Sequence, residues 1–233
     1  LLVSLGNEVC ARWTEPDEGI WEVRSGRHHH TFSKAMCWVA LERLLALHEE
    51  GYVSVPVDRY RTEAANIRAA VEEQGYNEEK ESYVATFGGD RLDASLLLLP
   101  TYGYEEATSP RMRSTFARIH EELAENGLLH RYPPDTDDGF ASEEGAFGLC
   151  SFWDEEMFAR LGRLDEAREK LGETIGYAND LGLFAEEIDP ETGAFLGNFP
   201  QAFTHVGLIN AAITIAKAEE EAPTALYEHP DPR

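Results

Sequence analysis

Apolar residues recur at helical spacing along almost the whole chain, and this periodicity is the feature that most constrains the fold. The segment at residues 32–50 is the clearest case, because its apolar residues return every three or four positions and Gly51 follows as a terminator. Only a short turn-bounded piece, residues 82–87, is typical of a strand. Such a chain can build layers of helices but has no series of strands for a sheet.

The same pattern predicts about eight helices joined by several long loops. We expect them at residues 1–13, 32–50, 57–73, 93–99, 112–125, 147–161, 164–181 and 199–219. Heavily apolar helices alternate with helices that carry a charged face, as an inner and an outer ring of helices would produce. Residues 222–233, with three prolines and acidic neighbours, are predicted to form a tail. The sequence therefore predicts a layered all-α domain over residues 1–221.

The charge of the chain limits its partners. It has 44 acidic and 20 basic residues, which gives a formal net charge of −24. Such a surface repels phosphate backbones, so we expect no nucleic-acid partner. No apolar run is long enough to cross a membrane, so we expect no membrane partner either. A neutral sugar would not be repelled.

The cysteines indicate the compartment of the protein, and the first residues indicate how much of it this chain contains. Cys10, Cys37 and Cys150 are an odd number of cysteines set among apolar residues, as buried free thiols in a reducing compartment would be. No signal-peptide pattern is visible, so we expect a cytoplasmic protein. The chain begins with Leu1 inside a helical pattern and without an initiator Met, so we expect an N-terminal part to be absent.

Two segments concentrate residue types that bind and hydrolyse sugars. Residues 15–24 read EPDEGIWEVR, and residues 182–193 read GLFAEEIDPETG. Carboxylates and guanidinium groups hydrogen-bond sugar hydroxyls, and aromatic rings stack on the apolar faces of sugars. A carboxyl held against Trp21 can also have its pKa raised, as a general acid requires. By composition alone, a solvated acidic turn is the favoured explanation of each segment.

Together these segments resemble the catalytic motifs of glycoside hydrolase family 15, which contains glucoamylases and bacterial trehalases. The resemblance covers about residues 1–220 in the family's order. It continues through HHTFSKAMCW at 29–38, LDASLL at 92–97, RYP at 131–133 and NFPQAFTH at 198–205. It implies an (α/α)6 barrel, or toroid, of which this chain holds only the later helices.

The resemblance also implies a reaction, the inverting hydrolysis of an α-glucoside such as trehalose or a maltooligosaccharide. Inversion requires an acid for the leaving oxygen and a base for water on the opposite face, with carboxyls about 6.5–9.5 Å apart. Glu22 matches the family's general acid and Glu186 its general base. No cofactor is implied. The missing upstream segment or a completing chain is expected to be needed for full activity.

Substrate-binding residues follow from the same resemblance. They are Asp17, Trp21, Arg24, Lys34, Arg131 and Phe147. Val23 stands where fungal glucoamylases carry a second Glu, and Phe147 stands where they carry a Trp, so the stacking platform is smaller here. By residue type alone, Lys34 is equally well explained as a solvated lysine at a helix start. Arg131 is nearly as well explained as a loop arginine that pairs with Asp135 or Asp137.

Three alternatives remain from the sequence. The His28–His30 run suggests a metal site, but adjacent side chains point in different directions and ligands on a helix are expected four positions apart, so we expect no metal. The chain could be a non-catalytic sugar-binding or structural helical fragment. It could also belong to an (α/α)-barrel phosphorylase, which would need a phosphate pocket in place of a base at Glu186.

Overall fold

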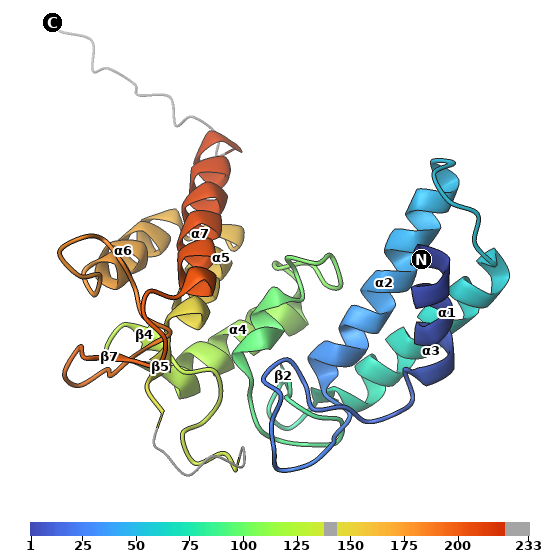
Figure 1. Cartoon of the computed structure of the whole chain (residues 1–233), viewed down its shortest axis with the longest axis horizontal. Coiled ribbons are helices and arrows are strands. Elements are labelled where there is room, and N and C mark those ends of the chain that lie inside the picture. The colour runs from blue at the N-terminus through green and yellow to red at the C-terminus, as the bar shows by residue number, and fades with distance from the viewer. Residues whose placement is uncertain (138–143, 222–233) are drawn as a thin grey trace, which may run out of the picture.

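The computed structural model describes residues 1–137 and 144–221. Within these ranges the chain forms seven α-helices and one 3-10 helix, connected by loops and very short strands (Figure 1). The helices are α1 (Leu2–Arg12), α2 (Thr31–Glu49), α3 (Val57–Gln74), η1 (Ala94–Leu98), α4 (Pro110–Leu123), α5 (Gly148–Arg160), α6 (Leu164–Ile175) and α7 (Ala202–Glu221). The tail predicted at 222–233 lies outside the described residues. No helix of the described part is long and apolar enough to cross a membrane.

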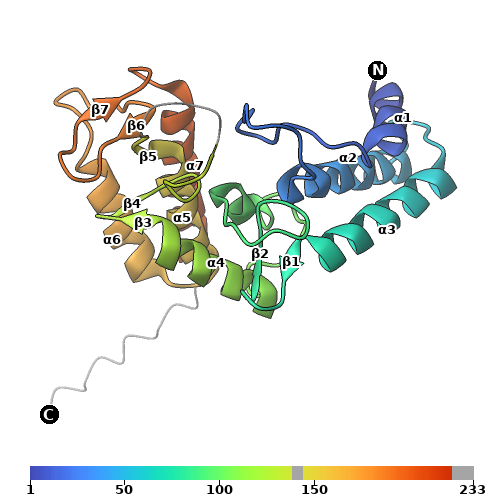
Figure 2. The same ribbon diagram turned by 90° about the horizontal axis from the view of Figure 1, so that it is seen from below.

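The helices lie in two groups that form an open arc (Figures 1 and 2). In the first group α2 and α3 pack side by side, and α1 packs against both. In the second group α5 packs against α6 and α7. Both η1 and α4 lie between the groups and contact α5. The arrangement confirms the prediction of an all-α fold.

Several helix boundaries agree with the predictions because local signals set them. The first three helices begin and end within about two residues of the expected positions. At α4 the Ser109 hydroxyl accepts a hydrogen bond from Met112 N at 3.1 Å, and Pro110 occupies the first turn, where it needs no donor. Asp93 caps η1 in the same way by accepting from Ser95 N at 2.7 Å.

The two largest errors in the predicted helix boundaries are at the end of α6 and the start of α7. The sixth helix ends at Ile175 and not at residue 181, because Gly176 and an Asn179 turn interrupt it; the Asn179 Oδ1 accepts from Leu181 N and Leu183 N. The last helix begins at Ala202 and not at residue 199. The residues before it pair instead with the segment around Glu186, since Gln201 N donates to Phe184 O at 3.0 Å.

Short strands, which the periodicity does not reveal, fasten the loops. In the described part they are β1 (Tyr76–Asn77), β2 (Ser82–Tyr83), β3 (Ala124–Glu125), β4 (Leu128–Leu129), β5 (Ala146–Phe147), β6 (Glu187–Ile188) and β7 (Phe195–Leu196). They form antiparallel sheets in the orders β1-β2, β3-β4 and β5-β6-β7. The strand predicted at 82–87 is therefore confirmed only over β2. The helix predicted to reach residue 125 stops at Leu123, since the next two residues pair with β4.

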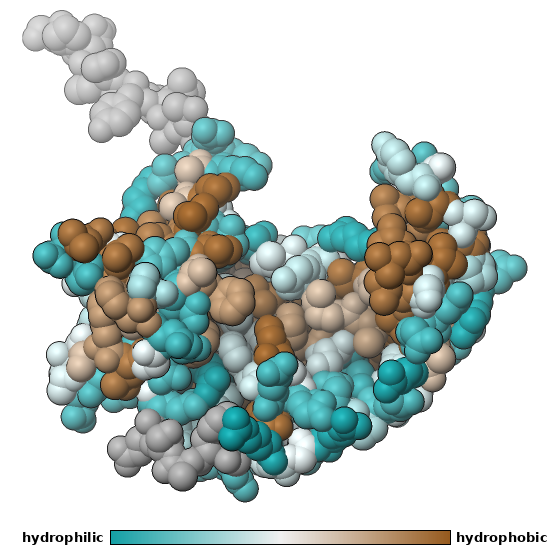
Figure 3. All heavy atoms as spheres, in the orientation of Figure 1, coloured by the Kyte–Doolittle hydropathy of each residue, from teal (hydrophilic) through white to brown (hydrophobic). Residues whose placement is uncertain are grey.

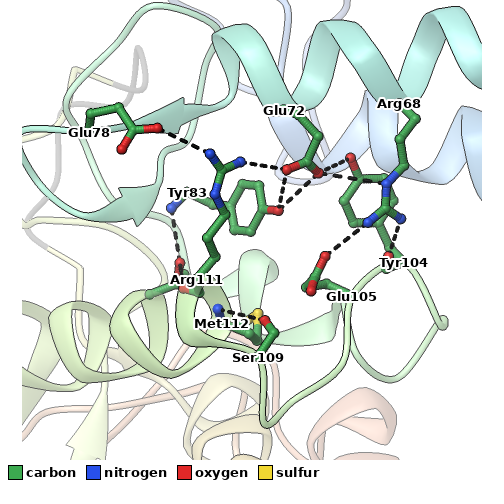
Figure 4. Close-up of polar contacts among 10 residues, drawn as sticks. Arg68, Glu72, Glu78, Tyr83, Tyr104, Glu105, Ser109, Arg111 and Met112 are labelled. Carbon is green, nitrogen blue, oxygen red and sulfur yellow. Dashed lines mark hydrogen bonds and ion pairs between the residues drawn. The ribbon is translucent and has the colours of Figure 1, made fainter.

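A network of charged and phenolic groups ties α3 to β2 and α4 (Figure 4). The Glu72 carboxylate accepts hydrogen bonds from Tyr83 Oη at 3.0 Å, Tyr104 Oη at 2.8 Å and Arg111 at 2.6 Å. Arg68 lies over the Tyr104 ring, with its guanidinium carbon 4.2 Å from the ring centre. Both carboxylate oxygens of Glu72 thus accept hydrogen bonds, which is what a partly buried carboxylate requires.

Apolar side chains are exposed at both ends of the arc, over α1 and along α7 (Figure 3). At α1 these are Leu1, directly before the helix, and Leu2 and Leu5 on it, and on α7 they are Phe203, Val206, Ile209 and Ile213. The α7 residues recur every three or four positions, so they form one stripe on the helix. Isolated apolar side chains are normal on a protein surface, but contiguous stripes of this kind mark surfaces that meet another partner.

Candidate active site

The loop between α1 and α2 is fixed at Asp17, one of the predicted sugar-binding residues. Its carboxylate accepts hydrogen bonds from Ser33 Oγ at 2.7 Å, Gly19 N at 2.9 Å and Lys34 Nζ at 3.1 Å. Burial opposes ionisation, but these donors outweigh it and lower the pKa of Asp17. The Lys34 side chain is only 3% exposed. The alternative of a solvated lysine is therefore wrong, and the geometry gives Lys34 the task of supporting the loop.

Glu22, the predicted general acid, lies in a tight turn of the same loop and is exposed. The turn is closed by Val23 N, which donates to Glu18 O at 3.1 Å. The φ angle of Glu22 is +52°, in the left-handed region, which costs a residue with a Cβ roughly 1 kcal/mol. Arg24 also lies on the exposed part of the loop. The neighbouring contacts must therefore hold this turn in place.

Trp21, the residue before Glu22, points into the protein. Its indole Nε1 donates to the Asp93 carboxylate, at 2.9 Å from Oδ2 and 3.1 Å from Oδ1. Its ring meets the Phe147 ring edge-on, with centroids 5.5 Å apart, and lies 6.0 Å from the Trp153 ring. Edge-to-face packing of this kind stabilises aromatic clusters beyond the area they bury.

Arg131 lies beside this aromatic cluster. Its guanidinium carbon is 5.7 Å from the centre of the Trp21 ring and 5.5 Å from that of Phe147. Its Nε and Nη2 form a two-point ion pair with Glu144, with Nε 2.8 Å from Oε2. The alternative pairing of Arg131 with Asp135 is wrong, since Asp135 pairs with Arg91 at 2.6 Å. Arg131 is thus placed next to Trp21 and Phe147, and its binding of sugar hydroxyls stays a prediction.

Glu186, the predicted general base, is held by residues that directly follow β7. Its Oε2 accepts hydrogen bonds from Asn198 Nδ2 at 2.8 Å and Asn198 N at 3.0 Å. Gly197 passes so close that a Cβ there would lie 2.7 Å from the same oxygen, and its φ of +69° also favours glycine. Asn198 and Gly197 thus orient the Glu186 carboxylate.

The neighbouring carboxylate, Glu187, lies on β6 opposite Phe147 of β5. It accepts a hydrogen bond from Gly145 N at 3.1 Å. Burial raises the pKa of Glu187, and the Gly145 N–H partly offsets that effect. Glu186, directly before β6, and Glu187 therefore have different partners, Asn198 and Gly145.

Phe147 is the place where the two predicted catalytic segments meet. It contacts Trp21, next to Glu22, and it pairs in register with Glu187, next to Glu186. The structure therefore brings Trp21, Arg131 and Phe147 together. Asp17 and Lys34 lie at the base of the same loop, and Arg24 lies on its exposed part.

A cavity of ≈ 350 Å³ opens beside Trp21. Its walls include Trp21, His28, His30, Arg91, Asp93 and Tyr132. A space of this size is within the range of small-molecule sites. In the described ranges, no group of three or more His, Cys, Asp or Glu side chains could hold a metal ion.

Sequence reasoning missed four residues that shape this site. These are Asp93, Glu144, Trp153 and Glu187. Two of them lie inside segments that carry the resemblance, Asp93 in LDASLL and Glu187 in AEE, so a signal was present but gave no role. Glu144 and Trp153 had no signal of their own, because each acts through a partner distant in sequence.

Solved structures define the class of the fold. A bacterial glucoamylase in complex with acarbose superposes with a TM-score of 0.76 at 14% identity, covering 94% of this chain and 38% of its own. A glucoamylase from Saccharomycopsis fibuligera gives 0.72 at 13% identity, covering 92% of this chain and 60% of its own. The chain therefore has part of the (α/α)6 barrel fold of glucoamylases.

Sequence comparison then gives the family. The profile described as Glycosyl hydrolases family 15 matches residues 5–213. A trehalase of Mycolicibacterium smegmatis is 44% identical over 94% of this chain and 33% of its own length. A trehalase of Mycobacterium tuberculosis is 42% identical over 94% of this chain and 32% of its own length. A trehalase of Thermoplasma volcanium is 37% identical over 88% of this chain and 33% of its own length. The chain belongs to glycosyl hydrolases family 15, and it spans about one third of the length of these relatives.

Proposed function

We propose that this chain supplies the acid and base carboxyls of a glycosidase that hydrolyses an α-glucosidic bond with inversion. The observation that carries the proposal is the meeting of the Glu22 and Glu186 segments at Phe147, beside Arg131. Family membership and relatives named trehalase support the same reading. Trehalose is the first substrate to test, because the more similar relatives are trehalases. Maltooligosaccharides are the second.

In this mechanism Glu22 protonates the oxygen of the leaving sugar, and Glu186 takes a proton from the water that attacks the anomeric carbon. A water fits between them if the carboxyls lie about 6.5–9.5 Å apart. The hydrogen bonds from Asn198 would orient Glu186 towards that water. Arg131 and the Trp21–Phe147 pair would contact the hydroxyls and the apolar face of the sugar. Asp17 and Lys34 would maintain the loop that presents Glu22.

We further propose that the upstream part of the barrel, or a completing chain, covers the apolar stripes on α1 and α7. The support is their exposure, for example 65% for Phe203, together with the one-third coverage of the relatives. The chain alone would then be weakly active or inactive, and would bind a dye specific for exposed apolar surface. Full activity of the isolated 233 residues would contradict this.

The cytoplasm is the proposed location, and the chemistry of the thiols supports it. Cys10, Cys37 and Cys150 are all free, and burial raises the pKa of each. Thiols of this kind persist in a reducing compartment. Detection of the protein in the periplasmic or secreted fraction of its native cells would contradict the proposal.

The anomeric form of the product tests the mechanism, in a protein that carries the upstream barrel segment as well as this chain. NMR at early times should show one α-glucose and one β-glucose from each trehalose, because only the attacked carbon inverts. Two α-glucose molecules would indicate retention. A requirement for inorganic phosphate, with glucose 1-phosphate as product, would indicate a phosphorylase.

Substitution of the two carboxyls tests their roles. Glu22→Gln and Glu186→Gln should each lower kcat by about 100-fold or more, while substrate binding persists, because the shape is kept and the proton transfer is lost. Glu191→Gln, an exposed position beyond β6, is the matched control and should retain the activity. Near-normal turnover by Glu22→Gln on trehalose would remove Glu22 from the mechanism.

A further inference from the structure

Asp93 is the carboxylate most deeply placed beside the candidate site, and the proposed mechanism does not use it. It is 6% exposed, and burial raises its pKa. Buried carboxylates destabilise a fold unless hydrogen bonds satisfy them. The positions of its partners therefore indicate what Asp93 does.

Capping η1 accounts for only part of the contacts of Asp93. The cap needs one acceptor, and Asp93 Oδ1 provides it to Ser95 N at 2.7 Å. Asn or Ser would cap equally well without burying a charge. The second oxygen, Oδ2, instead accepts the Trp21 indole N–H at 2.9 Å, from a residue 72 positions away. The carboxylate is thus matched to two donors from different segments.

The same segment is also bonded to Arg131. Ala94 N, directly after Asp93, donates to Arg131 O at 2.9 Å. Asp93 therefore stands where the Trp21 loop, η1 and the Arg131 segment meet. A shift of its side chain would be transmitted to two of the groups that surround the candidate site.

Glu22 depends on such an anchor because its own backbone is strained. Its φ is +52°, and it lies between Trp21 and an exposed stretch of loop. Before this turn the loop is fixed by Asp17, and at the turn itself the Trp21 side chain is the inward attachment. The direction of the Glu22 carboxyl is thus set by the turn, which Val23 N closes on Glu18 O, together with the point at which Trp21 is held.

We propose that Asp93 is a positioning residue, which clamps the Trp21 indole through its carboxylate and so fixes the orientation of Glu22. The inference rests on the proposed role of Glu22 as general acid. Asp93 does not touch the substrate in this proposal. A misplacement of about 1 Å at a reacting group can lower a rate about 100-fold, so a clamp of this kind affects kcat more than KM.

The test compares Asp93→Asn, Trp21→Phe and the double variant in the protein that carries the whole barrel. Asp93→Asn keeps the shape but turns one acceptor into a donor opposite the indole N–H. We expect kcat for trehalose to fall about 10- to 100-fold with little change in KM. Trp21→Phe should lower kcat to a similar extent and also raise KM, because Trp21 is proposed to contact the sugar as well. In the double variant kcat should be no lower than in the more impaired single variant. Asp180→Asn, an exposed aspartate of the turn after α6, is the control and should keep the parent's kcat.

A spectroscopic signature separates positioning from a structural role. The chain has four tryptophans, and the indole N–H resonance of Trp21 is identified by its loss in Trp21→Phe. In Asp93→Asn that resonance should shift and exchange faster with solvent, while the resonances of Trp13 and Trp38 stay in place. An unshifted Trp21 resonance overturns the proposal. A shifted resonance with unchanged kcat in the folded protein overturns it as well.

The outcomes also distinguish this inference from the proposed function. If the parent protein hydrolyses neither trehalose nor maltose, the proposed function fails and the catalytic consequence of the clamp fails with it. If the parent is active but Asp93→Asn matches it in kcat, only the positioning role of Asp93 fails.

Discussion

Phe147 meets Trp21 edge-on, with ring centroids 5.5 Å apart, although the two residues are far apart in the sequence. The contact links the α1–α2 loop to the start of α5. Since Phe147 also pairs in register with Glu187, it connects the loop that carries Glu22 to the strand next to Glu186. One residue therefore connects both halves of the candidate site, through its ring to Trp21 and through its backbone to Glu187.

Replacing Phe147 by Leu tests whether the ring serves the site as well as the core. Leu keeps most of the apolar volume, so we expect a loss of stability of about 1 to 2 kcal/mol. Because the flat face is lost, KM for trehalose should rise several-fold in the protein with the complete barrel. Steady-state kinetics and urea unfolding measure the two effects.

Phe116→Leu is the matched control for this substitution. Phe116 is a buried α4 residue that packs on Phe158, with ring centroids 4.9 Å apart, away from the site. It should lose similar stability while keeping the parent's KM. If both variants change KM equally, the Phe147 ring has no role beyond packing.

Asp17 and Lys34 should contribute unequally to stability, because they are unequally buried. In Asp17→Asn the Lys34 ammonium, with a side chain 3% exposed, loses its countercharge, and we expect a loss of about 3 kcal/mol. In Lys34→Met the Asp17 carboxylate stays 34% exposed and keeps its bonds from Ser33 and Gly19, so about 1 kcal/mol is expected.

The double variant Asp17→Asn/Lys34→Met makes this a closed cycle. It should be more stable than Asp17→Asn alone, since no unpaired buried charge remains. Equilibrium unfolding in urea gives all three differences. Strict additivity of the two single changes would mean that the ion pair makes no specific contribution.

The sequence predicted what local signals determine and missed what distant segments determine together. Periodicity and terminators such as Gly51 and Gly75 placed the first three helices. The early end of α6 was missed, because the Asn179 turn competes with a continuing helical pattern. Apart from β2, the two-residue strands were missed for a different reason, since each exists only through its partner segment.

The same distinction holds at the candidate site. Glu22 and Glu186 were identified by their motifs, and the structure brings their segments to Phe147. Asp93 lies 72 positions from Trp21, and no local pattern predicts that the two side chains will bond. The buried state of Lys34 could not be predicted either, because its partner in the loop is fixed only when α2 packs beneath it.

Glu72→Gln tests the network that joins α3, β2 and α4. An amide retains a single acceptor oxygen and presents an NH2 group to the Tyr83, Tyr104 and Arg111 donors, so some of them lose their partner. We expect a loss of about 2 to 3 kcal/mol in unfolding free energy. Glu73→Gln, the exposed neighbour on the same helix, should change stability by less than about 0.5 kcal/mol. Equal effects at both positions would contradict a structural role for the network.

Glu155 should make the stability of the protein depend on pH. This α5 side chain is 1% exposed, and burial, reinforced by Asp154 and Glu156, raises its pKa from 4.5 to about 8. The folded state therefore keeps the carboxyl neutral up to about pH 8, whereas the unfolded state ionises it above pH 4.5. The contribution of this group to stability is fully present below pH 4.5 and is lost as pH rises towards 8, by about 1.4 kcal/mol per pH unit.

Glu155→Gln should remove that dependence, because glutamine is neutral in both states. The variant should match the parent near pH 4.5 and exceed it in unfolding free energy at pH 7 and above, with the gap widening until about pH 8. Glu169→Gln, an exposed position on α6, should leave the pH slope of the parent unchanged. Urea unfolding at a series of pH values measures the slopes. If parent and Glu155→Gln lose stability in parallel between pH 5 and pH 8, the Glu155 carboxyl is ionised in the folded protein, and the packing of α5 against α6 must supply it with a donor.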